Sequence, residues 1–162
     1  MTVLPPLDEY DMGAPEGWCP IERTLELIGT NSAMVLLREV FYGVHRFDDL
    51  TRRAGVTESI AAKRLQQLVD GGLLARSPYR EAGQRTRHEY LLTERGRELY
   101  PIVVALMRFG QGLPHEHQTK ISMAHVDCGA DIAPEVRCAA GHVVPIDETV
   151  VQVVTLAGKP VR

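Results

Sequence analysis

Cysteine and histidine side chains near the C-terminus have the types and spacing of a metal site. His125 is followed three residues later by Cys128, and Cys138 is followed four residues later by His142. Two thiolates and two imidazoles form the tetrahedral set that zinc prefers. A zinc ribbon uses two CxxC pairs, however, and Gly141 occupies the place of the last cysteine. The pattern predicts either a variant zinc site or a degenerate ribbon that has lost its metal.

The third cysteine, Cys19, stands directly before Pro20 at the expected start of a helix. A helix N-terminus favours the thiolate, which is the reactive form of a cysteine. Cys19 is therefore a candidate redox sensor, and the alternative is a half-buried cysteine without a role. Three cysteines are too few for a disulfide-stapled secreted fold. Motifs of hydrolases, phosphate-binding loops and dinucleotide-binding folds are missing from the sequence, so an enzyme is not indicated.

Basic side chains gather in the middle of a chain whose net charge is −3. Residues 52–87 hold eight Lys and Arg against three Asp and Glu. The eight bases are Arg52, Arg53, Lys63, Arg64, Arg76, Arg80, Arg85 and Arg87. Such a concentration in a mildly acidic protein indicates a polyanionic partner.

The elements expected around these bases are helices followed by a hairpin. Caps and apolar spacing predict helices from Pro20 to Gly29, from an Asn31 or Ser32 cap to Gly43, and over 47–54. Thr57 caps the next helix, over 57–69, which has Ala61, Leu65 and Leu68 on one face and Ser59, Ala62, Lys63 and Gln66 on the opposite face. Strands over 73–79 and 87–92 follow, and they enclose a basic turn. A last helix follows Thr93, and Pro101 is expected to kink or restart it.

This order of elements predicts a mainly α (α+β) fold, the winged helix-turn-helix, in which 57–69 enters the major groove and the basic wing 79–87 contacts the flanking backbone or minor groove. Ser59, Lys63 and Gln66 are expected to hydrogen-bond to base edges, and the arginines to contact phosphates. The candidate DNA-binding residues are Arg52, Arg53, Thr57, Ser59, Ala62, Lys63, Arg64, Gln66, Arg80, Gln84, Arg85 and Arg87.

Residues 19–109 resemble the HxlR-type winged helix regulators of bacteria, in motifs that keep the family's order and nearly its spacing. These motifs are CPIERTLELIG (19–29), LLRE (36–39), RFDDL (46–50), GVT (55–57), AKRLQQL (62–68), DGGLLAR (70–76) and YLLTERGRELYPIV (90–103). The chain departs from the family where Thr30, Asn31 and Ser32 replace a Gly-Lys-Trp sequence, and where Ala61 replaces a common leucine.

The resemblance implies a homodimeric transcriptional regulator, probably a repressor by family habit, without catalytic activity. It implies that the N-terminal arm and the first and last helices form the dimer. An apolar stripe on the last helix, too wide for one chain to cover, agrees with this. The candidate interface residues are Ile21, Leu25, Leu99, Ile102, Val103, Leu106 and Met107. Two-fold symmetry then implies a palindromic operator on double-stranded DNA. The family also includes members that sense oxidants through a cysteine in the Cys-Pro position.

The chain is expected to divide into an N-terminal arm (1–18), a winged helix and dimerisation domain (19–113), and a linker with a small β-rich appendage (114–162). With no membrane segment or signal peptide in view, a cytoplasmic protein is expected. The alternative function is a thiol- or metal-responsive sensor or interaction protein that works through Cys19 or the C-terminal His/Cys cluster. A small molecule or an oxidant is the effector that these interpretations allow.

Overall fold

A computed structural model describes residues 1–3, 19–80, 83, 85–114 and 121–152 of the chain. It divides the chain into two compact units. The larger unit is Pro20–Ala133, and the smaller unit combines Met1–Cys19 with Pro134–Arg162. Within the described residues, no helix has both the length and the apolar character needed to cross a membrane.

The larger unit begins with four helices, α1 (Pro20–Ile28), α2 (Asn31–Phe41), α3 (Phe47–Ala54) and α4 (Glu58–Asp70). Thr57 caps α4 as predicted, because its side-chain oxygen accepts a hydrogen bond from the amide of Ile60. The cap of α2 was predicted at Asn31 or Ser32 and is instead Thr30, which accepts from the Ala33 amide at 3.2 Å.

The turn between α3 and α4 depends on Gly55, which ends α3 in the left-handed region at φ 64°. A residue with a Cβ is strained there, so glycine allows the tight helix-turn-helix connection.

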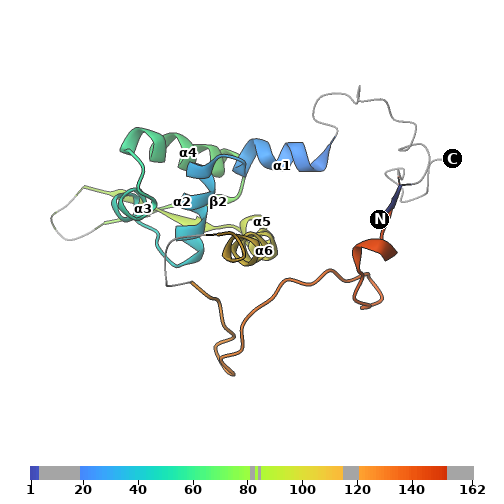
Figure 1. Cartoon of the computed structure of the whole chain (residues 1–162). Helices are drawn as coiled ribbons and strands as arrows, with labels where there is room; N and C mark the ends of the chain where they lie inside the picture. The colour runs from blue at the N-terminus through green and yellow to red at the C-terminus, as the bar shows by residue number, and fades with distance from the viewer. Residues whose placement is uncertain (4–18, 81–82, 84, 115–120, 153–162) are drawn as a thin grey trace. The chain divides into compact units, whose positions relative to one another are not determined.

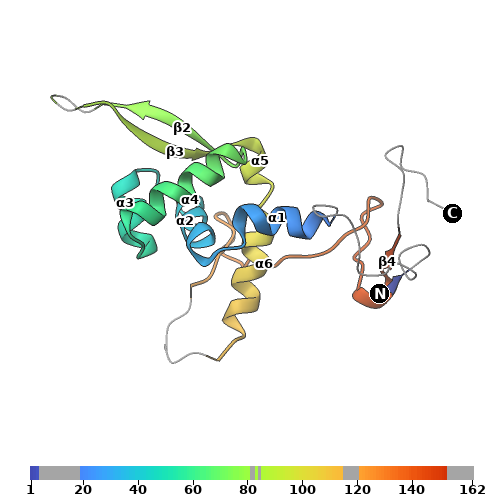
Figure 2. The same cartoon turned by 90° about the horizontal axis from the view of Figure 1, so that it is seen from above.

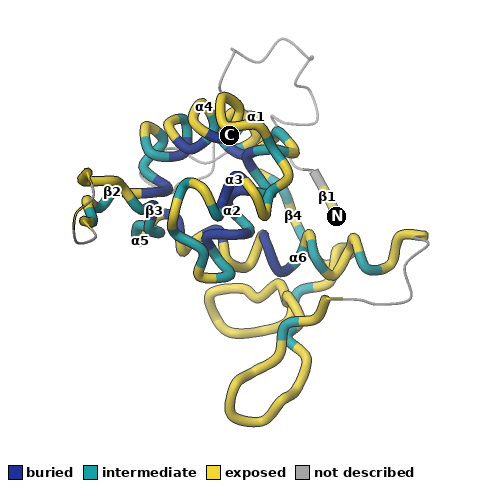
Figure 3. The backbone as a smooth tube through the Cα atoms, turned by 90° about the vertical axis from the view of Figure 1, so that its left-hand side faces the viewer, coloured by how far each residue is buried: buried dark blue, intermediate teal, exposed yellow. Residues whose placement is uncertain are grey.

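The hydrophobic core lies where α2, α3 and α4 meet the base of the wing. Ala61, Leu65 and Leu68 of α4 are fully buried in it, which confirms the predicted inner face of this helix. They pack in one cluster with Leu36, Leu37, Val40, Leu50, Leu73, Leu74 and Tyr90. The buried backbone is concentrated in these helices in Figure 3. The core therefore fixes which face of α4 is turned to solvent.

The wing is an antiparallel hairpin of β2 (Leu74–Tyr79) and β3 (Arg87–Leu92), as predicted. Leu74 pairs with Leu92 at its base, and Tyr79 pairs with Arg87 where the described strands end. Figures 1 and 2 show the hairpin running outward past α3 and α4, while α1 and α6 lie toward the other end of the unit.

The last helical segment is broken as the position of Pro101 predicted. A short helix, α5 (Glu94–Arg97), is followed by α6 (Tyr100–Gln111), with Pro101 in the first turn of the second helix. Proline lacks an amide hydrogen, which costs nothing in a first turn, so the chain restarts a helix at this point. Thr93 caps α5 and also donates a 2.6 Å hydrogen bond to the carbonyl of Gly72.

The predicted β-rich appendage contains short strands in the smaller unit. In that unit β1 (Thr2–Val3) pairs in parallel with β4 (Val150–Val151), and a 3-10 helix, η2 (Ile146–Glu148), precedes β4. The expectation of a weakly ordered arm was wrong for Thr2 and Val3, because β4 supplies them with backbone partners. Residues 4–18 of the arm, and the predicted strand beyond 152, lie outside the described residues.

Residues 121–133, assigned to the appendage from the sequence, lie in the same compact unit as the winged helix. Met123 and Ile132 of this segment line a small cleft against Val104 and Met107 of α6. The side-chain amide of Gln111 also donates to the carbonyl of Ile121. The predicted domain boundary at 113 stays a prediction.

Gly96 provides a test of this packing. It is buried in α5, where a Cβ would overlap the carbonyl oxygen of Leu73. Gly96→Ala is therefore expected to lower the free energy of unfolding by about 1–3 kcal/mol, measured by urea denaturation. Gly110→Ala is the matched control, since a Cβ at Gly110 of α6 meets nothing within 4 Å. Equal stability of the two variants would contradict the close approach.

Candidate nucleic-acid interface

The outward face of α4 carries the side chains predicted to read bases. Ser59, Ala62, Lys63 and Gln66 are all exposed, opposite the buried face of the helix. The Ser59 hydroxyl lies 3.3 Å from that of Thr57. In the described part of the chain, Lys63 makes no hydrogen bond or ion pair. Its ammonium group is therefore available to an incoming acceptor such as a guanine edge.

Gln66 was predicted to pair with adenine, and the structure gives its amide two protein partners. Its nitrogen donates to a carboxylate oxygen of Asp70 at 2.7 Å, and its oxygen accepts from Arg76 of β2 at 3.4 Å. A bidentate contact with a base would have to replace both bonds. Gln66 links the recognition helix to the wing in this structure.

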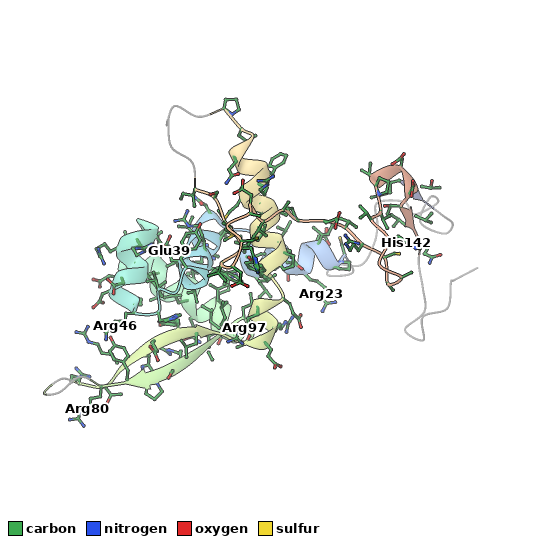
Figure 4. The ribbon with its side chains drawn as sticks, turned by 90° about the horizontal axis from the view of Figure 1, so that it is seen from below. Arg23, Glu39, Arg46, Arg80, Arg97 and His142 are labelled. Carbon is green, nitrogen blue, oxygen red and sulfur yellow. The ribbon has the colours of Figure 1, made fainter. Side chains whose placement is uncertain are left out.

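The base of the wing is anchored to the loop between α2 and α3. The Tyr90 amide donates to the carbonyl of His45 at 2.9 Å, and Arg46 forms an isolated antiparallel bridge with Glu89. The Arg46 guanidinium also lies over the Tyr79 ring, 4.9 Å from its centroid. Figure 4 shows Arg46 between α3 and the hairpin. These contacts hold the wing at a fixed position beside α4.

A cleft of about 290 Å³ separates the wing from α3 and α4. Ala62 of α4 lines it on one side, and Arg76, Arg87 and His88 line it on the wing side. Arg87 also forms a 2.9 Å ion pair with Asp48 of α3. Arg76 was not among the predicted DNA-binding residues, although its place in the basic stretch 52–87 was a usable signal.

The two arginines of α3 are both paired with carboxylates. Arg52 pairs with Asp49 one turn earlier on the helix surface. Arg53 donates from Nε to Glu39 of α2 at 2.7 Å, and Arg38 donates to the other oxygen of Glu39 at 2.6 Å. Both α3 arginines remain substantially exposed, so the rest of each guanidinium faces solvent.

Glu39 is the buried centre of this network, with 3% of its side chain exposed (Figure 4). Burial by itself raises the pKa of Glu39, but the hydrogen bonds and positive charges of Arg53 and Arg38 outweigh burial. The net result is a pKa below the ordinary value of 4.5. Sequence reasoning missed Glu39 as a support for the interface, because its partner Arg53 lies fourteen residues away on another helix.

Two further side chains of α4 are directed toward α1 and α2. Arg64, a predicted DNA contact, donates to the Ser32 hydroxyl at 3.3 Å and to the Gln67 amide oxygen at 2.8 Å. Gln67 donates to the carbonyls of Glu26 and Leu27 at the end of α1. These bonds tie the recognition helix to both earlier helices, so Arg64 has a structural partner that its sequence position did not indicate.

The described part of the wing tip is basic. Arg80 lies at the far end of the hairpin in Figure 4, and Arg85 is exposed on the other side of the turn. Gln84, also a predicted contact, lies outside the described residues.

The predicted dimer residues divide into buried and exposed groups. Leu99 and Val103 are buried in the chain's own core, so both were wrong as interface residues. Ile21, Leu25, Ile102 and Leu106 are exposed, and Met107 is partly buried with its sulfur 3.5 Å from the Tyr42 hydroxyl. Exposed aromatic side chains that the prediction omitted, Tyr100 and Phe109, also belong to α6.

The residues of the predicted zinc site lie in short hairpins. His125 and Cys128 are in the larger unit, with Nδ1 and Sγ 3.3 Å apart. Cys138 and His142 are in the smaller unit, where the Cys138 amide donates to the His142 carbonyl at 3.0 Å. Among the described residues, no three His, Cys, Asp or Glu side chains are grouped to hold a metal. Cys19 is half-buried. Zinc binding and thiol sensing stay predictions.

The fold and this surface together define a class of protein. Helices α3 and α4 form a helix-turn-helix, and the hairpin beside them is the wing, with a basic tip. Such an arrangement is that of a winged-helix DNA-binding protein.

Comparison with known proteins identifies the family within that class. Residues 27–118 match the HxlR-like helix-turn-helix family. An HTH-type transcriptional regulator of Mycobacterium bovis is 40% identical over 119 residues, which cover 73% of this chain and 74% of that protein. A regulator of Synechocystis is 31% identical over 106 residues, 65% of this chain and 77% of the relative.

Solved structures agree with this assignment. The protein PA1607, assigned as a transcription factor, superposes with a TM-score of 0.72 at 29% identity, over 83% of this chain and 94% of its own. The redox regulator HypR in its reduced form has a TM-score of 0.52 at 31% identity, over 57% of this chain and 91% of its own. The chain belongs to the HxlR-like helix-turn-helix family, and it is a DNA-binding transcriptional regulator rather than an enzyme.

The Glu39 network leads to a prediction about acid stability. Because its pKa is lowered in the folded state, Glu39 stabilises the fold above the ordinary pKa of 4.5, and this contribution is lost as pH falls through the lowered value. Glu39→Gln is therefore expected to cost about 1.5–3 kcal/mol of unfolding free energy at pH 7. The difference from the unsubstituted protein should shrink on acidification to pH 3, as measured by denaturant titration at each pH. A difference independent of pH would contradict the ionic network.

Proposed function

We propose that this regulator acts as a homodimeric repressor on a palindromic operator, with α4 in the major groove and the wing on the flanking backbone or minor groove. The observation that carries the proposal is the position of the wing beside the exposed face of α4. A helix that presents Ser59 and Lys63 has basic side chains next to it where a phosphate strand would pass.

The proposed contacts fall into two groups. Ser59, Ala62 and Lys63 face the bases, since the N-terminal part of a recognition helix enters the groove most deeply. Arg76 and Arg87 grip one phosphate strand from the cleft between the wing and α4. The ion pair of Arg87 with Asp48 joins two exposed side chains. Surface pairs of this kind contribute about 0–1 kcal/mol, so a phosphate can replace the carboxylate at low cost.

The remaining arginines are proposed to extend the phosphate contacts on both sides. Arg52 and Arg53 line a cleft of about 410 Å³ together with Arg46 and His45. Arg80 and Arg85, at the other end, are carried by the wing tip. Each phosphate that these groups neutralise releases counterions, so the affinity should fall steeply with salt.

The dimer is supported by exposed apolar side chains on α1 and α6. Ile21 and Leu25 on α1, with Ile102, Leu106 and Phe109 on α6, are all more than two-fifths exposed. Leaving these groups in water is unfavourable, and a second copy presents the same chemistry. We propose that two copies bury these faces against each other. A dimer that spans a promoter excludes polymerase, which is the basis for repression.

Lys63→Ala and Arg85→Ala should affect DNA binding in different ways. Loss of Lys63 is expected to cost about 1–3 kcal/mol of discrimination between the operator and unrelated duplexes. Loss of Arg85 should weaken both to the same degree and reduce the slope of log affinity against log salt by about 0.9 for each phosphate lost. Binding is measured by fluorescence anisotropy over a salt series on an operator selected from randomised duplexes.

The control for this pair is Arg97→Ala, which removes the same charge from an exposed site on α5 (Figure 4). It should leave affinity and slope unchanged. A selection that recovers no preferred sequence, or variants that behave like Arg97→Ala, would falsify the proposed interface.

Leu106→Glu tests the proposed dimer. Leu106 is 50% exposed on α6, and a carboxylate there would be desolvated if a partner covered it. Sedimentation velocity is expected to show a dimer for the unsubstituted chain and a monomer for the variant, with weaker binding to the full palindrome. Val126→Glu is the control, since Val126 is 92% exposed in the larger unit. A dimer that survives in Leu106→Glu would exclude this interface.

A further inference from the structure

One side chain on the recognition helix is apolar and exposed. Ile60, the third residue of α4, keeps 42% of its surface exposed. Among the described residues between Thr30 and Leu99, Ile60 is the one large hydrophobic side chain that is exposed. The other exposed large hydrophobic side chains lie in or next to α1 and α6, or in the N- and C-terminal segments. Ile60 is therefore separate from the proposed dimer surface.

The local backbone fixes where Ile60 stands. Its amide donates to the capping oxygen of Thr57, so it belongs to the first turn of the helix. On that turn it adjoins Ser59, and Lys63 follows one turn later, both exposed and polar. Because Ile60 is β-branched, few rotamers are open to it, and its methyl groups hold a nearly constant direction.

The other reading side chains leave room for an apolar contact. The amide of Gln66 is occupied on both sides by Asp70 and Arg76. Arg64 is directed toward Ser32 of α2. Of the long side chains on this part of α4, Lys63 and Ile60 are those that no protein partner restrains. Lys63 offers hydrogen bonds, and Ile60 offers only apolar surface.

We propose that Ile60 is a specificity-determining residue, and that it recognises the 5-methyl group of a thymine in each half of the operator. In unmodified DNA that methyl is the apolar group that a base pair displays in the major groove. The edges of guanine, cytosine and adenine present polar atoms there, and burying those against Ile60 would leave them without partners. The inference rests on the proposed function, because it requires α4 to lie in the groove.

The test uses the full chain and duplexes that differ by one methyl group. An operator is first selected from randomised duplexes with the unsubstituted protein. Each thymine of one half-site is then replaced in turn by deoxyuridine, which lacks the 5-methyl alone. Affinity is measured for the unsubstituted chain, for Ile60→Val, which keeps an apolar β-branched side chain, and for Ile60→Ala. Ile146→Ala is the matched control, since Ile146 is an exposed isoleucine of the smaller unit.

We expect one deoxyuridine position to weaken binding by the unsubstituted chain about fourfold, the cost of one lost methyl contact. Ile60→Ala should bind the thymine operator more weakly and show no further loss at that position. Ile60→Val and Ile146→Ala should keep the sensitivity to deoxyuridine. Thermal unfolding and circular dichroism check that Ile60→Ala is folded.

The possible failures are distinguishable. If the selection returns no preferred sequence, the proposed function fails together with this inference. If a sequence is selected but contains no thymine whose methyl matters, or if Ile60→Ala remains as sensitive to deoxyuridine as the unsubstituted chain, only the role of Ile60 is overturned.

Discussion

The recognition helix depends on its packing against α2 and α3 through Ala61, Leu65 and Leu68, which are fully buried. Burial of a leucine side chain contributes about 1.5–3 kcal/mol, so these contacts form a large part of what holds α4 in place. Once this face is committed to the core, helix geometry turns the opposite face to solvent. The polar reading surface, the position of the wing and the clefts between them all follow from this burial.

The charges of the interface are arranged in two tiers. Glu39 is buried and paired with two arginines, so it fixes α3 on α2 and is costly to disrupt. The pair of Arg87 with Asp48 is exposed, and its partners can separate for little energy. A surface that must meet phosphates therefore has a rigid support beneath and exchangeable pairs above. The wing shares this design, because backbone bonds to His45 and the ring of Tyr79 hold its base while its tip stays exposed.

The exposed apolar side chains separate into surfaces with different uses. Those of α1 and α6 form broad faces on two helices, of the size that a second copy would cover. Ile60 is single and surrounded by polar groups, which suits contact with one small apolar group. The hairpin with His125 and Cys128 packs with the winged helix through its neighbours on α6. A signal received there would reach the helix that carries the proposed dimer face.

The sequence by itself determined the order of the elements, because caps, glycines and apolar spacing act within a few residues. Thr57 starts α4, Gly55 precedes it, and Pro101 restarts the last helix, all as local rules require. Tertiary structure alone decided the partners of the charged side chains and the burial of Leu99 and Val103. The physical reason is that periodicity sets a side chain's direction around its own helix axis. Distances to groups on other elements depend on how the elements pack, which local spacing does not specify.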